Sequence, residues 1–210
     1  MRRLDHISDL HFCRVDQGAV DSLLARLNGD PADLVVVSGD LTMRARRREY
    51  AAARAFLDAL RAPWVAVPGN HDITAYYPWE RFLDPFGRWG EFIAEDPEPV
   101  WQDGEVQVIG LNTVARAHLN TLDWQNGRVP RAGLLRVLRR LRRLPEGPYR
   151  IVVAHHPFLA PEDAPTTPVL ERGSARCVTW RGRGCGWCSR GTCTGATRGR
   201  MGWQRMAGRH

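Results

Sequence analysis

Short segments with the composition of strands alternate with longer amphipathic segments, and this alternation limits the folds open to the chain. The expected strands are residues 4–8, 33–38, 63–67, 106–111 and 150–154. The expected helices, recognised by apolar residues at helical spacing, are residues 19–27, 46–60 and 131–144. Strands separated by helices predict an α/β layered fold with a largely parallel sheet core.

Residues 73–101 interrupt the alternation with four Pro and several aromatic residues. We expect a long irregular loop there, of the kind that shapes a substrate mouth more often than a core. Its aromatic side chains could stack on a base, or could equally hold the loop together. They are Tyr76, Tyr77, Trp79 and Trp89. Trp79 is the candidate for a substrate contact.

Polar residues follow four of the expected strands directly. They are Asp9 and His11 (SDLH), Asp40 (GDLT), Asn70, His71 and Asp72 (GNHD), and His155 and His156 (AHHP). An isolated Asp or Asn at such a place is usually a turn former or a helix cap. Four such groups at strand ends are harder to explain in that way, because this edge of an α/β sheet is where ligands bind. Their oxygen and nitrogen donors suit Mn, Fe, Zn or similar divalent ions, and a shared carboxylate would build a two-metal centre that clamps a phosphate.

These motifs, in this order, resemble those of the calcineurin-like metallophosphoesterases, especially a bacterial branch similar to cyclic-nucleotide phosphodiesterases. The resemblance covers nearly all of residues 3–171, and its motifs are specific jointly although each is weak alone. It implies a four-layer α/β/β/α sandwich, truncated here at its C-terminal side, with two divalent ions (Mn, Fe or Zn) at the strand ends. The implied reaction is hydrolysis of a small phosphodiester, with a cyclic nucleotide as a candidate. A phosphomonoester substrate stays open.

The resemblance also implies which residues hold the metals. Asp9 and His11 would hold the first ion, and Asp40 would bridge both. Asn70 and His155 would hold the second ion. Of the two adjacent histidines we prefer His155 because it lies nearer the strand.

Three other residues of the motifs would act on the substrate. His71 would face the phosphate as the acid. Asp72 would orient His71 through its far ring nitrogen and favour the imidazolium. His156 would contact the phosphate or support the ligands.

The remaining residues near the motifs have ordinary interpretations. His6 lies inside the first strand and is expected to be a packed core residue. Cys13 is expected to be a small buried side chain. His118 is expected to be solvated in a loop.

The chain departs from the family pattern after residue 172. The family's other two ligands come from a later GHxH motif, which the sequence lacks, and loss of these ligands should weaken metal binding. Residues 173–210 hold eight Arg, four of the five Cys and no acidic residue, whereas residues 1–172 hold 22 Arg against 23 Asp and Glu. We therefore expect an incomplete catalytic domain at residues 1–172 and a largely disordered tail without helix or strand at residues 173–210. One sheet would then expose an unpaired edge.

Three explanations of this tail stay open. Cys177, Cys185, Cys188 and Cys193 could form a zinc site, although their spacing is not that of a double knuckle. The basic, Trp-bearing tail could instead bind nucleic acid by charge and stacking. Alternatively, the reading frame is broken near Gly173, because the codons of residues 184–195, read from the third base, permit VRLVLSGHLHG, which contains the missing motif.

The sequence also sets expectations for location and partners. No segment approaches the length of a membrane span and the N-terminus lacks the features of a signal peptide, so we expect a cytoplasmic protein without a membrane partner. The near-neutral charge of residues 1–172 makes a nucleic-acid polymer an unlikely substrate and favours a small phosphoester. Two classes of function stay open: a metal-dependent phosphoesterase, and a catalytically weak or inactive protein of the same fold. The sequence does not predict the oligomeric state.

Overall fold

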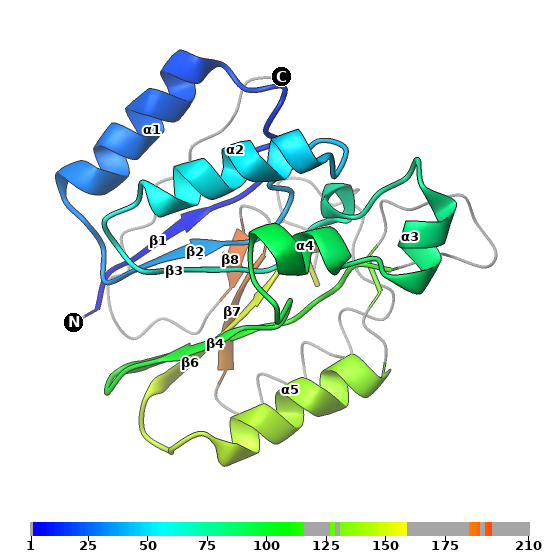
Figure 1. Cartoon of the computed structure of the whole chain (residues 1–210). Coiled ribbons are helices and arrows are strands. Elements are labelled where there is room, and N and C mark those ends of the chain that lie inside the picture. The colour runs from blue at the N-terminus through cyan, green and yellow to red at the C-terminus, as the bar shows by residue number, and fades with distance from the viewer. Residues whose placement is uncertain (1, 116–126, 129–130, 159–184, 190–191, 195–210) are drawn as a thin grey trace.

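The computed structural model contains two β-sheets that lie face to face between helices (Figure 1). It describes residues 2–115, 127–128, 131–158, 185–189 and 192–194. The first sheet is parallel and has the order β1 (Leu4–Ile7), β2 (Leu34–Val37), β3 (Trp64–Ala66). The second sheet has the order β4 (Val100–Gln102), β5 (Val106–Gly110), β6 (Tyr149–Ala154), β7 (Cys185–Ser189), β8 (Thr192–Thr194). In it β5, β6 and β7 are parallel, while β4 and β8 are antiparallel to their neighbours.

Side chains that alternate along the strands build the layers. On β2, Val35 and Val37 pack into the cluster beneath the helices, while Leu34 and Val36 pack into the cluster between the two sheets. All four side chains are buried, as expected for a parallel strand covered on both faces. The four-layer α/β/β/α arrangement follows from this double burial.

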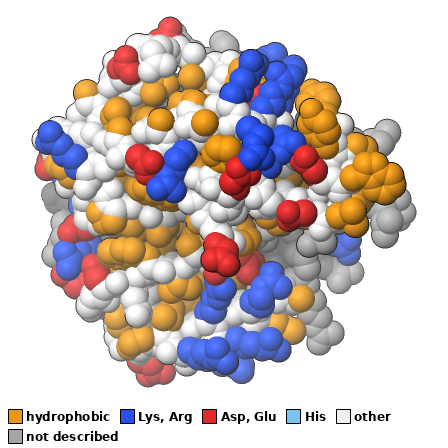
Figure 2. Space-filling model, viewed as in Figure 1, with side chains coloured by type: hydrophobic (Ala, Val, Ile, Leu, Met, Phe, Trp, Pro, Cys, Tyr) orange, Lys and Arg blue, Asp and Glu red, His pale blue; other side chains and the backbone are white. Residues whose placement is uncertain are grey.

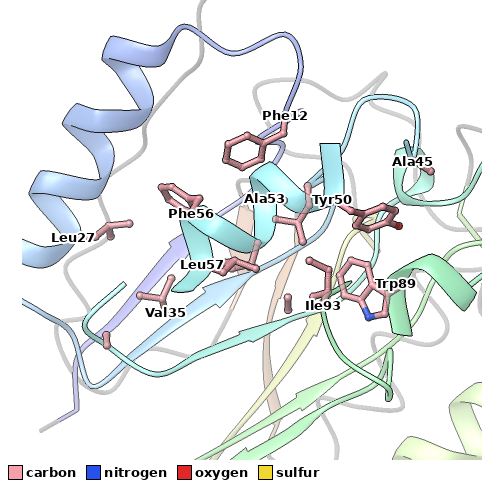
Figure 3. Packing of buried hydrophobic residues seen from close by; sticks show 14 residues of the cluster. Phe12, Leu27, Val35, Ala45, Tyr50, Ala53, Phe56, Leu57, Trp89 and Ile93 are labelled. Atoms are coloured by element: carbon pink, nitrogen blue, oxygen red, sulfur yellow. The ribbon is translucent and has the colours of Figure 1, made fainter. Parts of the chain in front are cut away.

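Helices α1 (Gln17–Gly29) and α2 (Arg47–Asp58) cover the first sheet, and α5 (Arg131–Arg143) covers the second (Figure 1). Helix α2 buries Tyr50, Ala53 and Leu57, whose spacing places them on one helical face (Figure 3). These elements confirm the expected alternation, with boundaries within two residues of the predictions.

The expectation of an irregular loop at residues 73–101 is wrong in part. The segment contains the short helices α3 (Pro78–Leu83) and α4 (Gly87–Phe92) as well as strand β4. Trp89 of α4 is fully buried in the cluster beneath α2, so it is a packing residue (Figure 3). Helices of this length are too short for a periodic apolar pattern, which explains why the sequence did not predict them.

The expectation that residues 173–210 contain no strand is also wrong. Strand β7 pairs in parallel with β6 in a register that places Ser189 opposite Ala154, so β6 does not form the unpaired edge that the sequence predicted. Pairing of this kind uses the backbone groups of an edge strand and does not require an apolar pattern. Apart from β7 and β8, this tail lies outside the described residues, as does His118. Among the described helices, none is both long and apolar enough to cross a bilayer.

Candidate metal centre

The loops that follow β1 and β2 are joined by backbone hydrogen bonds beyond the ends of the strands. Asp9 N–H donates to Gly39 C=O at 3.1 Å, and His11 N–H donates to Asp40 C=O at 2.9 Å. Asp9, His11 and Asp40 have positive φ angles of 58°, 47° and 54°. Non-glycine residues adopt this left-handed conformation at a cost, and such residues cluster at functional sites whose surroundings hold them in place.

Two groups of possible metal ligands meet at this edge and share one residue. In each group the ligand atoms lie within 4.8 Å of one another: the first contains His11, Asp40 and His71, and the second contains Asp9, Asp40 and His155. Asp9 Oδ1 is also 3.8 Å from His11 Nε2, so the pair expected for the first ion lies together. The structure thus brings the strand-end motifs of both sheets to one place.

Asp40 is the residue that the two ligand groups share. Its side chain is fully buried; Oδ1 accepts a hydrogen bond from His71 N–H at 2.9 Å, while Oδ2 accepts none from the described residues. The Nε2 atoms of His155 and His11 lie 3.4 Å and 3.8 Å from Oδ2. A buried carboxylate oxygen without a donor is costly unless a cation compensates it, so the residues present fit a metal ion.

His155 presents one ring nitrogen to this carboxylate. Its Nδ1 lies 2.8 Å from Ser38 C=O, which fixes the Nδ1–H tautomer, and its Nε2 lies 3.1 Å from Asn70 Oδ1. Burial lowers the pKa of His155, but the attraction of the nearby Asp40 carboxylate outweighs burial and raises it. Burial likewise acts against the charge of Asp40, yet His155 and the His71 N–H hold the pKa of Asp40 well below its usual range. Both side chains would be available to hold a divalent ion.

His71 and Asp72 do not have the contact expected from the sequence. His71 Nδ1 lies 2.8 Å from Met43 C=O, and Asp72 instead accepts hydrogen bonds from the N–H groups of Leu41, Thr42 and Gly69 at 3.2, 2.8 and 2.9 Å. The expectation that Asp72 orients His71 through the far ring nitrogen is therefore wrong. Asp72 ties the loops after β2 and β3 together, and burial and the nearby Asp40 charge raise its pKa to about 6.

Two glycines of the motifs are required by close approach. A Cβ atom at Gly69 would lie 2.1 Å from Asp40 Oδ1, and a Cβ atom at Gly39 would lie 2.8 Å from His155 Nδ1. Gly39 also has a φ of 91°, which side chains rarely tolerate. Only glycine therefore lets the two loops approach the ligands at these positions.

The other residues considered from the sequence lie in different surroundings. His156 is buried, with Nδ1 2.8 Å from Thr113 Oγ1 and its ring edge-on to His155, but it is not in either ligand group. Trp79 lies on α3 and is 80% exposed. His6 is half-buried, with Nε2 2.8 Å from Ser38 Oγ, and burial lowers its pKa to about 4.

Cys13 is exposed, so the expectation of a buried thiol is wrong. The preceding Phe12 takes the buried position, where its ring lies 5.8 Å from that of Phe56. Sequence reasoning missed Met43 and Thr113 as partners of site histidines. A contact through a backbone carbonyl, as at Met43, leaves no signal in the side chain, and Thr113 belongs to no motif.

Comparisons with known proteins identify a family and a fold. The calcineurin-like phosphoesterase family matches residues 2–193. Glycerophosphodiester phosphodiesterase GpdQ of Enterobacter lignolyticus is 42% identical over 86 residues, which cover 35% of this chain and 31% of that protein. The chain thus spans about a third of the length of this curated relative.

Solved structures share the fold at low sequence identity. A dimetal phosphatase from Danio rerio is 13% identical with a TM-score of 0.58, over 85% of this chain and 77% of that one. The purple acid phosphatase PPD1 of yellow lupin seeds is 14% identical with a TM-score of 0.51, over 76% of this chain and 31% of that one. From the extent of the family match and the ligand groups at the strand ends, the chain belongs to the calcineurin-like phosphoesterase family.

Proposed function

We propose that this chain hydrolyses a small phosphodiester at a centre of two divalent ions. The observation that carries the proposal is Asp40, which belongs to both ligand groups and has a buried carboxylate oxygen without a hydrogen bond from the described residues. The partial match to a glycerophosphodiester phosphodiesterase favours a diester over a monoester. A cyclic nucleotide and a glycerophosphodiester are the candidate substrates.

The chain's own residues have separate tasks in this proposal. Asp9, His11, Asp40, Asn70 and His155 would hold the two ions, which would act as Lewis acids on the phosphoryl group when bound. Oxygen and nitrogen donors of this kind suit Mn, Fe or Zn. His155 is held for this task by Ser38 C=O, and Asn70 adds a neutral donor beside an anionic substrate.

His71 is the proposed acid for the leaving oxygen. Its Nδ1 is engaged with Met43 C=O, so Nε2 is the ring nitrogen left for the ligand groups and the substrate. A proton held at Nε2 would pass to the leaving alkoxide as the bond to phosphorus breaks. His156, buried beside His155, would support the ligands or contact the phosphate.

A catalytically weak protein of the same fold is the second candidate. The observation that favours it is the lack of a GHxH motif in the sequence, since two imidazole ligands of the family pattern are then missing. The two candidates differ in metal content and in turnover.

Metal reconstitution combined with turnover tests the proposal. The purified chain is loaded separately with Mn, Fe or Zn, its bound metal is measured, and its rate with bis(nitrophenyl) phosphate is compared with its rate with nitrophenyl phosphate. Two ions per chain and a faster rate with the diester are expected. A chain that binds no metal, or binds metal without any turnover, would sink the proposal and favour the second candidate.

A further inference from the structure

Glu49 is a buried carboxylate that belongs to neither ligand group. It lies in the first turn of α2 and is 1% exposed. Its Oε2 accepts a hydrogen bond from Arg46 N–H at 3.3 Å, which is the ordinary capping-box bond at a helix start. The shorter bond, at 2.7 Å, comes from Arg44 N–H, two residues before the cap. Capping therefore does not account for the shorter of its two bonds.

The Arg44 N–H and the Met43 C=O belong to the same peptide unit. Because this unit is planar and trans, its N–H and C=O point in opposite directions. The N–H meets Glu49 Oε2 at 2.7 Å, and the C=O meets His71 Nδ1 at 2.8 Å. One rigid group thus connects a buried carboxylate to the imidazole of the proposed acid.

The hydrogen bond from Arg44 N–H to Glu49 also changes how strongly the Met43 carbonyl accepts a hydrogen bond. A hydrogen bond to a carboxylate polarises the peptide, which makes its carbonyl a stronger acceptor for His71. Site histidines often donate directly to a carboxylate, but the nearby Asp72 is occupied by backbone N–H groups. Glu49 supplies the negative charge through the Met43–Arg44 peptide and not by direct contact with His71.

The loop does not depend on Glu49 alone for its shape. Arg88 Nη1 donates to Ala45 C=O at 2.7 Å, and Ala45 N–H donates to Thr42 Oγ1 at 3.1 Å. These bonds hold the turn in which Ala45 has a φ of 52°. A conservative change at Glu49 should therefore leave the loop folded.

We propose that Glu49 is a positioning residue that, through the Met43–Arg44 peptide, keeps a proton on His71 Nδ1 and so directs Nε2, the nitrogen that would carry the acid's proton, to the ligand groups. The kinetic consequence rests on the proposed function, because only a phosphoesterase would use His71 as an acid. The tautomer itself does not depend on activity.

Imidazole nitrogen resonances of the metal-free protein, labelled with ¹⁵N at histidine, test the proposal directly. In the neutral form of its ring, His71 of the parent is expected to carry its proton on Nδ1. Glu49→Gln keeps the shape and the capping-box acceptor but removes the charge. It should lower the ratio of Nδ1–H to Nε2–H by up to about twofold, because the charge reaches His71 only through the polarised peptide. An unchanged ratio in Glu49→Gln overturns the proposal.

A matched control separates this effect from helix capping. Asp16 caps α1 by accepting a hydrogen bond from Ala19 N–H at 2.8 Å, on a helix outside this loop. Asp16→Asn removes a carboxylate charge from a helix start but keeps a good N-cap residue, and it should not change the His71 tautomer. A tautomer shift in Asp16→Asn equal to that in Glu49→Gln would show a general loss of structure and would also overturn the proposal.

Turnover of the metal-loaded enzyme distinguishes this inference from the proposed function. Glu49→Gln should lower kcat more for a diester with a poor leaving group than for one with a good leaving group, with KM unchanged. A tautomer shift in a protein without any turnover supports the positioning role while the proposed function fails. Equal loss of kcat for both leaving groups contradicts the kinetic part of the proposal.

Discussion

At the scale of single residues, Asp40 and His71 have neighbouring positions but different expected effects. Asp40 belongs to both ligand groups, so Asp40→Ala should remove bound metal and abolish turnover together. The surface change Asp58→Ala, which removes a carboxylate paired with Arg54, should leave both unchanged. Metal analysis and turnover of the two variants check this prediction. Retention of both ions in Asp40→Ala would contradict the bridging role.

His71→Ala should keep the metal while it slows turnover. Loss of a general acid typically costs about 10²- to 10⁴-fold in rate, and less for good leaving groups, which need no proton. Turnover with two diesters of different leaving-group pKa, together with metal analysis, checks this. Because one His71 nitrogen lies within 4.8 Å of ligand atoms of His11 and Asp40, loss of metal in His71→Ala would instead make His71 a ligand.

The sequence predicted which residues would meet, but not all of their contacts. Asp9, Asp40 and His155 were found because carboxyl ends of parallel strands converge at one edge. The partner of His71 could not be found, since a backbone carbonyl at Met43 depends on the path of a loop and not on its side chains. The exposure of Cys13 was missed for the same reason.

At the scale of elements, α3 presents exposed hydrophobic side chains beside charged ones (Figure 2). The Arg44 guanidinium lies 5.7 Å from the centre of the Tyr76 ring, so the chain entering α3 lies beside the loop that holds Met43. Trp79 is 80% exposed and Leu83 of the same helix is 78% exposed. Side chains this exposed contribute little to stability. A change in KM on substituting one of them can therefore be assigned to a lost contact with the substrate.

Trp79→Ala should raise KM for a nucleotide diester more than it lowers kcat, because a stacking contact binds the substrate equally before and during reaction. Leu83→Ala is the matched control, an equally exposed residue without an aromatic ring, and should change neither constant. Steady-state kinetics of both variants check this. An unchanged KM in Trp79→Ala would remove Trp79 from the substrate site.

The accuracy of the predicted elements followed their length and burial. Helix α2 was predicted because 12 residues are enough to show an amphipathic period, and β2 because LVVV is buried on both faces. Helices α3 and α4, of six residues each, gave no such period. Strand β7 has no apolar run, and its pairing with β6 follows from the backbone.

At the scale of the whole molecule, β7 bears on the hypothesis of a broken reading frame. Strand β7 is parallel to β6, so its carboxyl end lies at the sheet edge that also carries His155. In the shifted reading, GHxH follows the codons of β7. Its two imidazoles would then reach the level of the ligand groups.

The nucleotide sequence across codons Glu171 to Gly195 decides this first, with Gly-His-x-His in the shifted frame as the expected result. The protein with a restored frame should bind two ions more tightly than the parent, because two imidazoles complete the ligand set. Metal titration of both proteins measures this. Codons that spell another sequence would contradict the hypothesis and reopen the zinc and nucleic-acid explanations of the tail.

The backbone hydrogen bonds between the loops after β1 and β2 also connect the candidate metal ligands to the first sheet. Asp9, His11 and Phe12 donate N–H groups to Gly39, Asp40 and Leu41, so the ladder of β1 and β2 continues into the ligands themselves. The loops therefore share the hydrogen-bond network of the sheet, so a change that loosens the sheet would also loosen them. An ion held there would meet ligands already positioned by the sheet, which makes metal affinity depend on the stability of the sheet as well as on the ligands.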